Sequence, residues 1–253
     1  MLGGRKSLSD TASRRELTSS LAQASPGELR VRETNGAVDV GPAREWLLPG
    51  ATELFRGIYT RSGTGTAEIL AVCSAISGEG RSTLSLGLGL TIAQDFPERR
   101  VLVVETDLQH PVLAEDFDVP PNPGLIECLL DGASLQAACR PTLLDNLCVV
   151  PAGGPTRNPR RLLASSRMAV VADAMRQTHD LVILDTPAVL VTSDAIVLAD
   201  LADSVIFVVR AGVTPLPLVN KALEQVDEDK LRGVVLNEAH SAIPGWLRRL
   251  CAL

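Results

Sequence analysis

The chain has 253 residues, of which 45% are hydrophobic, so it can bury a substantial core and form one or two domains. Its formal net charge of −6 argues against nonspecific nucleic-acid binding through bulk charge. No run approaches about 18 uninterrupted apolar residues and the N-terminus has no apolar signal core, so the sequence predicts a soluble, cytoplasmic protein.

The N-terminal residues 1–48 predict a flexible arm, because they are rich in Ser, Gly and Thr and show little periodicity. Up to Arg32 the arm holds six Lys or Arg against three acids. Such an arm could touch an anionic membrane surface, although a solvated tail is the simpler interpretation. A short helix is expected over 51–61, inside a single domain that covers 49–240, and 241–253 form a short tail.

Residues 68–94 read as a strand, a phosphate-binding loop and a helix. Ile69 to Cys73 is an apolar run, the next residues are small, and leucines recur at near-helical spacing from Ser82 onward. Gly78 and Gly80 would let backbone N–H groups turn toward an anion at the N-terminus of the helix. Ser82 would then offer its hydroxyl to a magnesium ion that bridges two phosphates.

This stretch departs from the phosphate-loop pattern G-x-x-x-x-G-K-[ST] at two positions. Ala75 stands where the first glycine is expected, and Arg81 stands where the lysine is expected. The second change affects chemistry, because a compact ammonium is replaced by a broad, planar guanidinium. The competing interpretation is a glycine-rich turn that binds nothing.

The rest of the chain alternates apolar strands with helical segments, which predicts a doubly wound α/β fold with a mostly parallel sheet. Strands are expected over 101–104, 147–150, 181–184, 204–209 and 233–236. The helices between them are expected over 124–130, 160–177, 193–201 and 217–226.

Polar residues follow several of these strands, at the sheet edge where ligands of such folds bind. Glu105 and Asp107 follow the second strand, Asp185 follows the strand that begins at 181, and Asn237 follows the last. A carboxylate just past a buried strand beside a phosphate loop suits a magnesium or water ligand. Each of these acids could instead simply end a strand or cap a helix.

The five cysteines show no C-x-x-C spacing, and three of them lie in apolar segments as expected for small buried thiols. The three histidines are scattered without metal-ligand spacing, so a surface role is expected for each: His110, His179 and His240.

Six segments resemble, in order and spacing, the bacterial tyrosine kinases of capsular and exopolysaccharide biosynthesis, which are relatives of the MinD and ParA ATPases. They are SAISGEGRST, VLVVETDLQHP, NLCVVPAGGPTRNPRRLL, DLVILDTPAVLVTSDA, SVIFVVRAG and GVVLNEA. The resemblance covers about 51–239, and residues 151–163 argue against a partitioning ATPase.

The resemblance implies a P-loop NTPase fold that binds ATP and Mg²⁺. It implies metal ligands at Ser82, Asp107 and Asp185, and catalytic roles for Arg81, Glu105, Asp107 and Asp185. Contacts to the nucleotide would come from a larger set, in which Asn237 lies near the base: Gly78, Glu79, Gly80, Arg81, Ser82, Thr83 and Asn237.

The resemblance also implies a function, as a tyrosine-kinase-like regulator of exopolysaccharide or capsule biosynthesis and chain length. Its partner would be a membrane polysaccharide co-polymerase, which would bring the protein to the inner face of the membrane, and a homo-oligomer is an open alternative. Three departures leave activity open: Arg81, Glu105 in place of the first aspartate of D-x-D, and a tail without tyrosine, since Tyr59 is the single tyrosine. The alternatives are a pseudokinase scaffold and a MinD/ParA-like positioning ATPase.

Overall fold

The computed structural model describes residues 67–116 and 119–238. These residues build a seven-stranded sheet with the strand order β3-β4-β2-β5-β1-β6-β7. Neighbouring strands are parallel except for β3 and β4, which confirms the predicted mostly parallel α/β fold. The strands are β1 Glu68–Ser74, β2 Val101–Glu105, β3 Arg140–Pro141, β4 Leu147–Val150, β5 Leu181–Asp185, β6 Ser204–Arg210 and β7 Leu231–Asn237.

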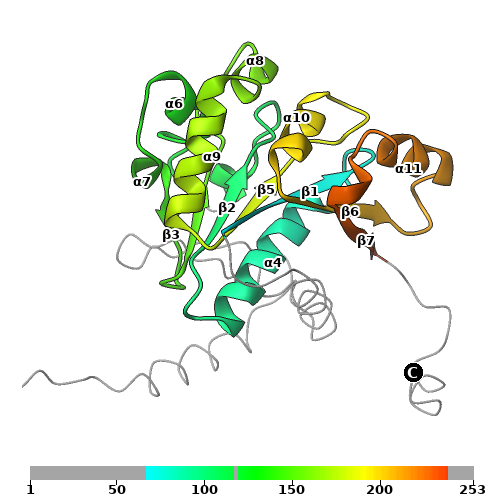
Figure 1. The fold of residues 1–253 in the computed structure, drawn as a ribbon, viewed down its shortest axis with the longest axis horizontal. Helices are drawn as coiled ribbons and strands as arrows, with labels where there is room; N and C mark the ends of the chain where they lie inside the picture. Colours follow the sequence, from blue (N-terminus) through cyan, green and yellow to red (C-terminus); the bar gives the residue numbers. More distant parts are fainter. Residues whose placement is uncertain (1–66, 117–118, 239–253) are drawn as a thin grey trace, which may run out of the picture. The chain divides into compact units, whose positions relative to one another are not determined.

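Helices cover both faces of this sheet (Figure 1). The helices are α4 Arg81–Asp95, α5 Leu113–Asp116, α6 Leu125–Leu130, α7 Leu135–Ala138, α8 Pro159–Leu163, α9 Ser166–Thr178, α10 Asp194–Leu201 and α11 Leu216–Leu223, with a 3-10 turn at Glu228–Lys230. One hydrophobic cluster joins α4 to the sheet, and a larger one joins α6, α9, α10 and α11 to the opposite face. The helices therefore wind on both sides, as in doubly wound folds.

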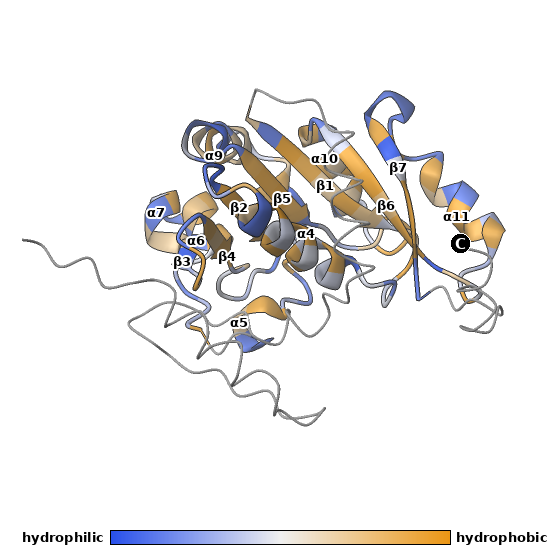
Figure 2. Ribbon diagram, turned by 90° about the horizontal axis from the view of Figure 1, so that it is seen from below, coloured by the Kyte–Doolittle hydropathy of each residue, from blue (hydrophilic) through white to orange (hydrophobic). Residues whose placement is uncertain are grey.

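The central strands β2 and β5 are hydrophobic up to the acid that ends each of them, because both of their faces are covered. Every residue of β2 and β5 is buried, and in Figure 2 these strands carry the colour of hydrophobic residues. In the sheet register, Asp185 at the end of β5 lies opposite both Val72 of β1 and Glu105 of β2. The ends of three strands thus converge beside the loop that leads into α4.

The predicted helix over 160–177 is wrong as a single helix. The chain breaks between α8 and α9, where Ser165 caps α9: its Oγ accepts from the Met168 N–H at 3.4 Å. The same hydroxyl donates to the Leu162 carbonyl at 2.6 Å. A serine that satisfies the ends of both helices ends one and begins the next, and the apolar periodicity alone did not reveal this break.

Several predictions fall outside the described residues: the arm 1–48, the helix 51–61 with Tyr59, His240 and the tail 241–253. Within the described ranges, no helix is both long enough and apolar enough to cross a membrane.

Candidate nucleotide-binding site

The loop between β1 and α4 has the backbone that an anion site requires. Gly78 and Gly80 adopt left-handed φ values of 80° and 91°. At Gly80 a side chain is also excluded by space, because a Cβ would lie 2.1 Å from Nδ2 of Asn237. The first turn of α4 carries no acidic residue, and its N-cap Gly80 makes no side-chain cap. The N–H groups and the positive end of the helix dipole are therefore available to a phosphate.

The buried side chain of Glu79 stabilises this loop through hydrogen bonds. Its carboxylate is almost fully buried and accepts from the Ile76 N–H at 2.8 Å, from the Arg210 N–H at 3.1 Å and from the Thr214 hydroxyl at 2.5 Å. Its carbonyl accepts from Nδ2 of Asn237 at 3.0 Å. The side chains of Glu79 and Asn237 thus hold the loop to the ends of β6 and β7. Their contacts to nucleotide and base stay predictions.

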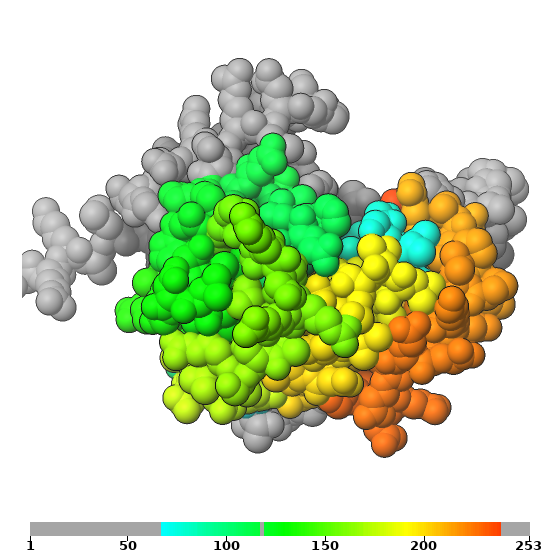
Figure 3. Space-filling view, turned by 90° about the horizontal axis from the view of Figure 1, so that it is seen from above, coloured from blue at the N-terminus to red at the C-terminus, as the bar shows by residue number. Residues whose placement is uncertain are grey.

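A pocket of about 410 Å³ opens beside this loop. It brings together five residues that the sequence singled out, Arg81, Ser82, Glu105, Asp107 and Asp185, and its other lining residues are Ser77, His110, Val112 and Thr186. In Figure 3 the cyan residues that follow β1 reach the surface beside the yellow and orange segments of the later half of the chain. Thr83 is exposed and is not among the lining residues.

Asp185 is a buried acid of the pocket. Burial, together with the nearby charge of Glu105, raises the pKa of its carboxyl from the usual 3.8 to about 6. Hydrogen bonds from Ser82 and Ser85 and the positive charge of Arg81 oppose this rise in pKa. The Ser85 hydroxyl donates to Oδ1 at 3.3 Å. The positive charge and hydrogen bonds around Asp185 therefore do not fully compensate for the burial of its charged form.

Glu105 acts as an acceptor for the backbone. Its Oε1 accepts from the N–H groups of Val112 at 2.5 Å and Leu113 at 2.8 Å, and its Oε2 accepts from Ala152 at 3.0 Å. Burial raises the pKa of this carboxyl, and the three N–H groups oppose that rise. Both oxygens are thus engaged in holding the segments after β2 and β4. A direct catalytic role for Glu105 stays a prediction that this geometry does not favour.

Asp107 is better placed to meet a ligand. Its Oδ1 accepts from the backbone N–H groups of Gln109 at 3.3 Å and His110 at 3.1 Å. The ring Nδ1 of His110 lies 3.7 Å from the same oxygen. Oδ2 of Asp107 has no hydrogen-bond partner within the described ranges, and the side chain is 18% exposed. Asp107 can therefore offer Oδ2 to a metal or to a proton while Oδ1 keeps its hydrogen bonds to the backbone turn.

Arg81 is tied to the protein at the base of the pocket. Its Nε donates to the Thr186 carbonyl at 2.7 Å, and its Nη1 donates to the Ile76 carbonyl at 3.0 Å and to the Ser74 hydroxyl. Nη2 has no partner among the residues that the structure describes and remains for a ligand. Two nitrogens of the guanidinium, Nε and Nη1, are thus fixed by the protein, which a lysine with its single ammonium nitrogen would not allow.

Sequence reasoning missed three residues of this network. Ser74 and Thr186 receive the hydrogen bonds of Arg81, and Ser85 donates to Asp185. For Ser85 a signal existed, because it lies three residues after Ser82 and shares its helix face. For the other two, the signal was the position directly at the ends of β1 and β5.

The structure also corrects the prediction for the histidines. His110 is exposed and lines the pocket. His179 is instead half-buried and lies with Cys139 and Cys148, so the expected surface role does not describe this residue. The three come from separate segments, which is why spacing along the chain did not reveal them.

The residues of the pocket fit Mg²⁺ with a nucleotide. Magnesium prefers hard oxygen ligands, and a serine hydroxyl with one or two carboxylates beside a phosphate loop supplies them. A bound divalent cation would also provide the positive charge that Asp185 lacks. Fold and pocket together define a protein of the P-loop NTPase fold with a candidate nucleotide pocket.

No family model matches the chain. Curated relatives nevertheless show its family. The chain is 31% identical over 179 residues to the tyrosine-protein kinase CpsD of Streptococcus agalactiae, covering 70% of this chain and 76% of CpsD. It is 32% identical over 177 residues to the succinoglycan biosynthesis transport protein ExoP of Rhizobium meliloti, but spans only 22% of that protein. The chain belongs to the bacterial tyrosine kinase family of capsule and exopolysaccharide biosynthesis, as its motifs predicted.

Solved structures agree with this assignment. The chimerical protein CapA2B2 matches with a TM-score of 0.72 and 26% identity, over 90% of this chain and 99% of that one. The cell division ATPase MinD of Pyrococcus furiosus matches with a TM-score of 0.56 and 23% identity, and this likeness shows the fold alone. The predicted MinD-like P-loop fold is confirmed.

Proposed function

We propose that this chain binds Mg²⁺ and ATP in the pocket beside the glycine loop and acts as a tyrosine-kinase-like regulator of exopolysaccharide or capsule biosynthesis and chain length. The observation that carries the proposal is the convergence of Ser82, Asp107 and Asp185 on one pocket at the N-terminus of α4. Membership of the tyrosine kinase family supplies the reaction class.

Each side chain has a definite task in this proposal. Backbone N–H groups of the loop and Nη2 of Arg81 bind the phosphates. Ser82 and Asp185 would hold the magnesium ion, which would supply positive charge beside the terminal phosphate. Asp107 would orient the incoming tyrosine hydroxyl and take its proton on Oδ2, as the oxygen–phosphorus bond forms and the bond to ADP breaks.

The acceptor tyrosine belongs to another molecule in this proposal, because Tyr59 is the single tyrosine of the chain. A membrane polysaccharide co-polymerase, or a protein attached to it, would supply the hydroxyl and bring the kinase domain to the inner face of the membrane.

The contacts of Arg81 favour a second candidate, a pseudokinase that binds nucleotide and acts as a scaffold without transferring phosphate. A guanidinium held by Thr186, Ile76 and Ser74 cannot follow a transferring phosphate as a lysine would. Such a protein would still bind nucleotide, because the loop, Ser82 and Asp185 are intact.

Phosphotransfer to a tyrosine-bearing cytoplasmic fragment of a co-polymerase separates the two candidates. The full chain is incubated with Mg²⁺ and ATP, and phosphotyrosine on the fragment is mapped by mass spectrometry. We expect slow transfer that Asp107→Asn and Asp185→Asn abolish. Nucleotide binding without phosphotransfer would establish the pseudokinase. A protein that neither binds nucleotide nor transfers phosphate would overturn the proposal.

A further inference from the structure

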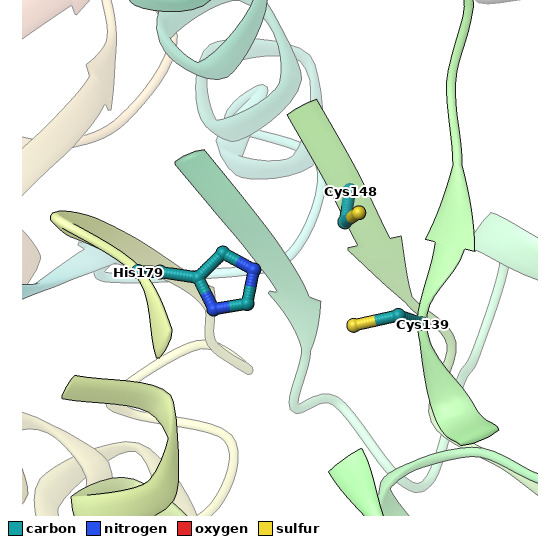
Figure 4. Close-up of side chains that lie close together, drawn as sticks. All are labelled: Cys139, Cys148 and His179. Atoms are coloured by element: carbon teal, nitrogen blue, oxygen red, sulfur yellow. The ribbon is translucent and has the colours of Figure 1, made fainter. Parts of the chain in front are cut away.

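A second cluster of reactive side chains lies outside the nucleotide pocket. One ligand atom from each of Cys139, Cys148 and His179 falls within 4.8 Å of the other two. Figure 4 shows the His179 ring directed toward the two sulfurs, which approach from neighbouring backbone segments. All three residues are half-buried, so solvent and small ions can reach the cluster.

Three different elements position these side chains. Cys139 ends α7 directly before β3, and Cys148 is in β4, where it pairs with Pro141. His179 caps the end of α9, and its backbone N–H donates to the Met175 carbonyl at 2.9 Å. The cluster lies near the N-terminal ends of β4 and β5, whereas the nucleotide pocket lies at the C-terminal ends of β2 and β5.

The histidine ring already has the orientation that a metal ligand needs. Its Nδ1 lies 2.9 Å from the Thr178 hydroxyl, which leaves Nε2 for the sulfurs. Metal-binding histidines commonly use their second ring nitrogen in this way, because the partner fixes the tautomer and the ring plane. Thr178 in turn donates to the Ala174 carbonyl at 2.8 Å, so this outer contact is itself anchored.

The electrostatics of the pair agree with this geometry. Hydrogen bonds from Cys139 and His179 lower the pKa of the Cys148 thiol, while the same contact raises the pKa of Cys139. The thiolate is the form of cysteine that binds metals.

We propose that Cys139, Cys148 and His179 form a binding site for a thiolate-preferring divalent ion of the zinc class, with the fourth position open to water or another ligand. Sulfur and imidazole ligands select zinc over magnesium or calcium. Zinc bonds of about 2.3 Å to sulfur and about 2.0 Å to nitrogen place tetrahedral ligand atoms a little under 4 Å apart. The three ligand atoms lie within 4.8 Å of one another, so small side-chain rotations would complete the site.

Such an ion would fasten the edge of the sheet to the helix that covers it. The strand β3 is only two residues long and pairs with β4 alone in the described part of the chain. A metal bond from Cys139 to His179 would link this edge to the end of α9. Binding to the folded state alone would then raise the free energy of unfolding.

Cobalt is the first probe, because its spectrum reports thiolate ligands directly. Untagged full chain, reduced and stripped with a chelator, is titrated with Co²⁺ and then with Zn²⁺. We expect one Co²⁺ per chain with thiolate-to-cobalt charge-transfer absorption, which Zn²⁺ displaces. Cys139→Ser, Cys148→Ser and His179→Ala should each weaken binding at least about tenfold, since even outer-contact changes cost that much. The matched control is Cys128→Ala, which removes a buried thiol of the same core outside the cluster.

Alkylation of the unmodified protein tests the same site without a variant. Zn²⁺ should protect Cys139 and Cys148 from a thiol reagent, as mapped by mass spectrometry, and Asp185→Asn should leave this protection unchanged. The proposal is overturned if cobalt binds without thiolate absorption, or if zinc gives no protection. A Cys139–Cys148 disulfide that forms readily while no metal binds would likewise overturn it, and would make the cluster a redox pair instead.

Discussion

Arg81 is the residue where this chain departs most from the phosphate-loop pattern, and its contacts show what the departure does. The guanidinium joins the ends of β1 and β5 through Ser74 and Thr186, and Arg81 also lines the pocket. In the proposed function it therefore combines a structural role with a ligand-binding one. A lysine would reach fewer of these acceptors but could follow a phosphate more closely.

Arg81→Lys is expected to leave nucleotide affinity within about tenfold, roughly 1.4 kcal/mol, while it raises turnover. The same change should lower the free energy of unfolding by about 1–2 kcal/mol, because hydrogen bonds to Thr186 and Ser74 are lost. Phosphate release and thermal melting measure the two effects. A variant that is as stable as the parent would show that the observed contacts contribute nothing.

Asp185 predicts a pH dependence of stability. Its folded pKa of about 6 exceeds the usual 3.8, so the folded state holds a proton that the unfolded state has lost. Stability should fall as the pH rises from about 4 to about 6, by up to about 3 kcal/mol, and then level off. Glu105 shifts in the same direction, whereas Arg81, Ser82 and Ser85 favour the charged form.

Asp185→Asn should flatten this slope and raise the melting temperature at pH 7.5. In the parent protein, magnesium with ATP should make stability rise rather than fall with pH over this range, because only the ionised Asp185 carboxylate binds the metal. Denaturant unfolding at several pH values checks both statements. An unchanged slope in the variant would show that Asp185 does not titrate in this range.

Glu105 is expected to matter for stability more than for chemistry. Glu105→Asp shortens the side chain by one methylene, so it should lose contact with at least one of the N–H groups of Val112, Leu113 and Ala152. We predict a loss of about 1–3 kcal/mol in the free energy of unfolding and no gain in turnover. Glu115→Asp, an exposed neighbour, is the matched control and should be neutral. Faster turnover in Glu105→Asp would restore the catalytic interpretation.

At the scale of elements, the seating of α4 on the sheet decides where the loop and Ser82 lie. Gly89 allows this close approach, because a Cβ there would lie 2.7 Å from Cγ2 of Val103 and 3.5 Å from Cδ1 of Leu147. Without that contact, alanine would be favoured over glycine in a helix by about 1 kcal/mol.

Gly89→Ala is therefore expected to destabilise the protein by about 1–3 kcal/mol and to weaken nucleotide binding, because α4 must shift away from β2. Val103→Ala should rescue the Gly89→Ala protein, which a double-mutant cycle measures as a favourable coupling. Additive effects of the two changes would mean that the helix does not move.

The sequence predicted the elements that depend on apolar runs and loop glycines. The strands β1, β2, β4, β5, β6 and β7 lie where expected, because strands buried on both faces read as continuous apolar runs. The β3 strand was missed, because two residues carry no pattern. The break between α8 and α9 was missed because Ser165 was not read as a cap.

Site residues were predictable where a strand ends in an acid, and not where a contact joins distant segments. Asp107 and Asp185 line the pocket as expected. The engagement of Glu105 with Ala152, 47 residues away, depends on how β2 and β4 pair. The meeting of Cys139, Cys148 and His179 depends likewise on tertiary packing, which spacing along the chain does not encode.

At the scale of the whole molecule, the family assignment and the pocket make one claim: this chain binds ATP with magnesium at the end of β1. The claim differs from family membership alone, because a phosphate loop with an arginine could also be a structural relic. Of the residues that the claim uses, Ser82 and Asp185 should matter mainly for the metal, and Gly80 for the shape of the loop.

The most direct test is calorimetric titration of the full chain with a non-hydrolysable ATP analogue, with and without Mg²⁺. We predict one site per chain, with affinity that depends on magnesium in the parent protein and loses most of that dependence in Ser82→Ala and Asp185→Asn. A companion melting curve at about 100 times the dissociation constant should show stabilisation of about 2.7 kcal/mol. No heat of binding and no thermal shift at millimolar analogue would contradict the account and leave the glycine loop as a turn that binds nothing.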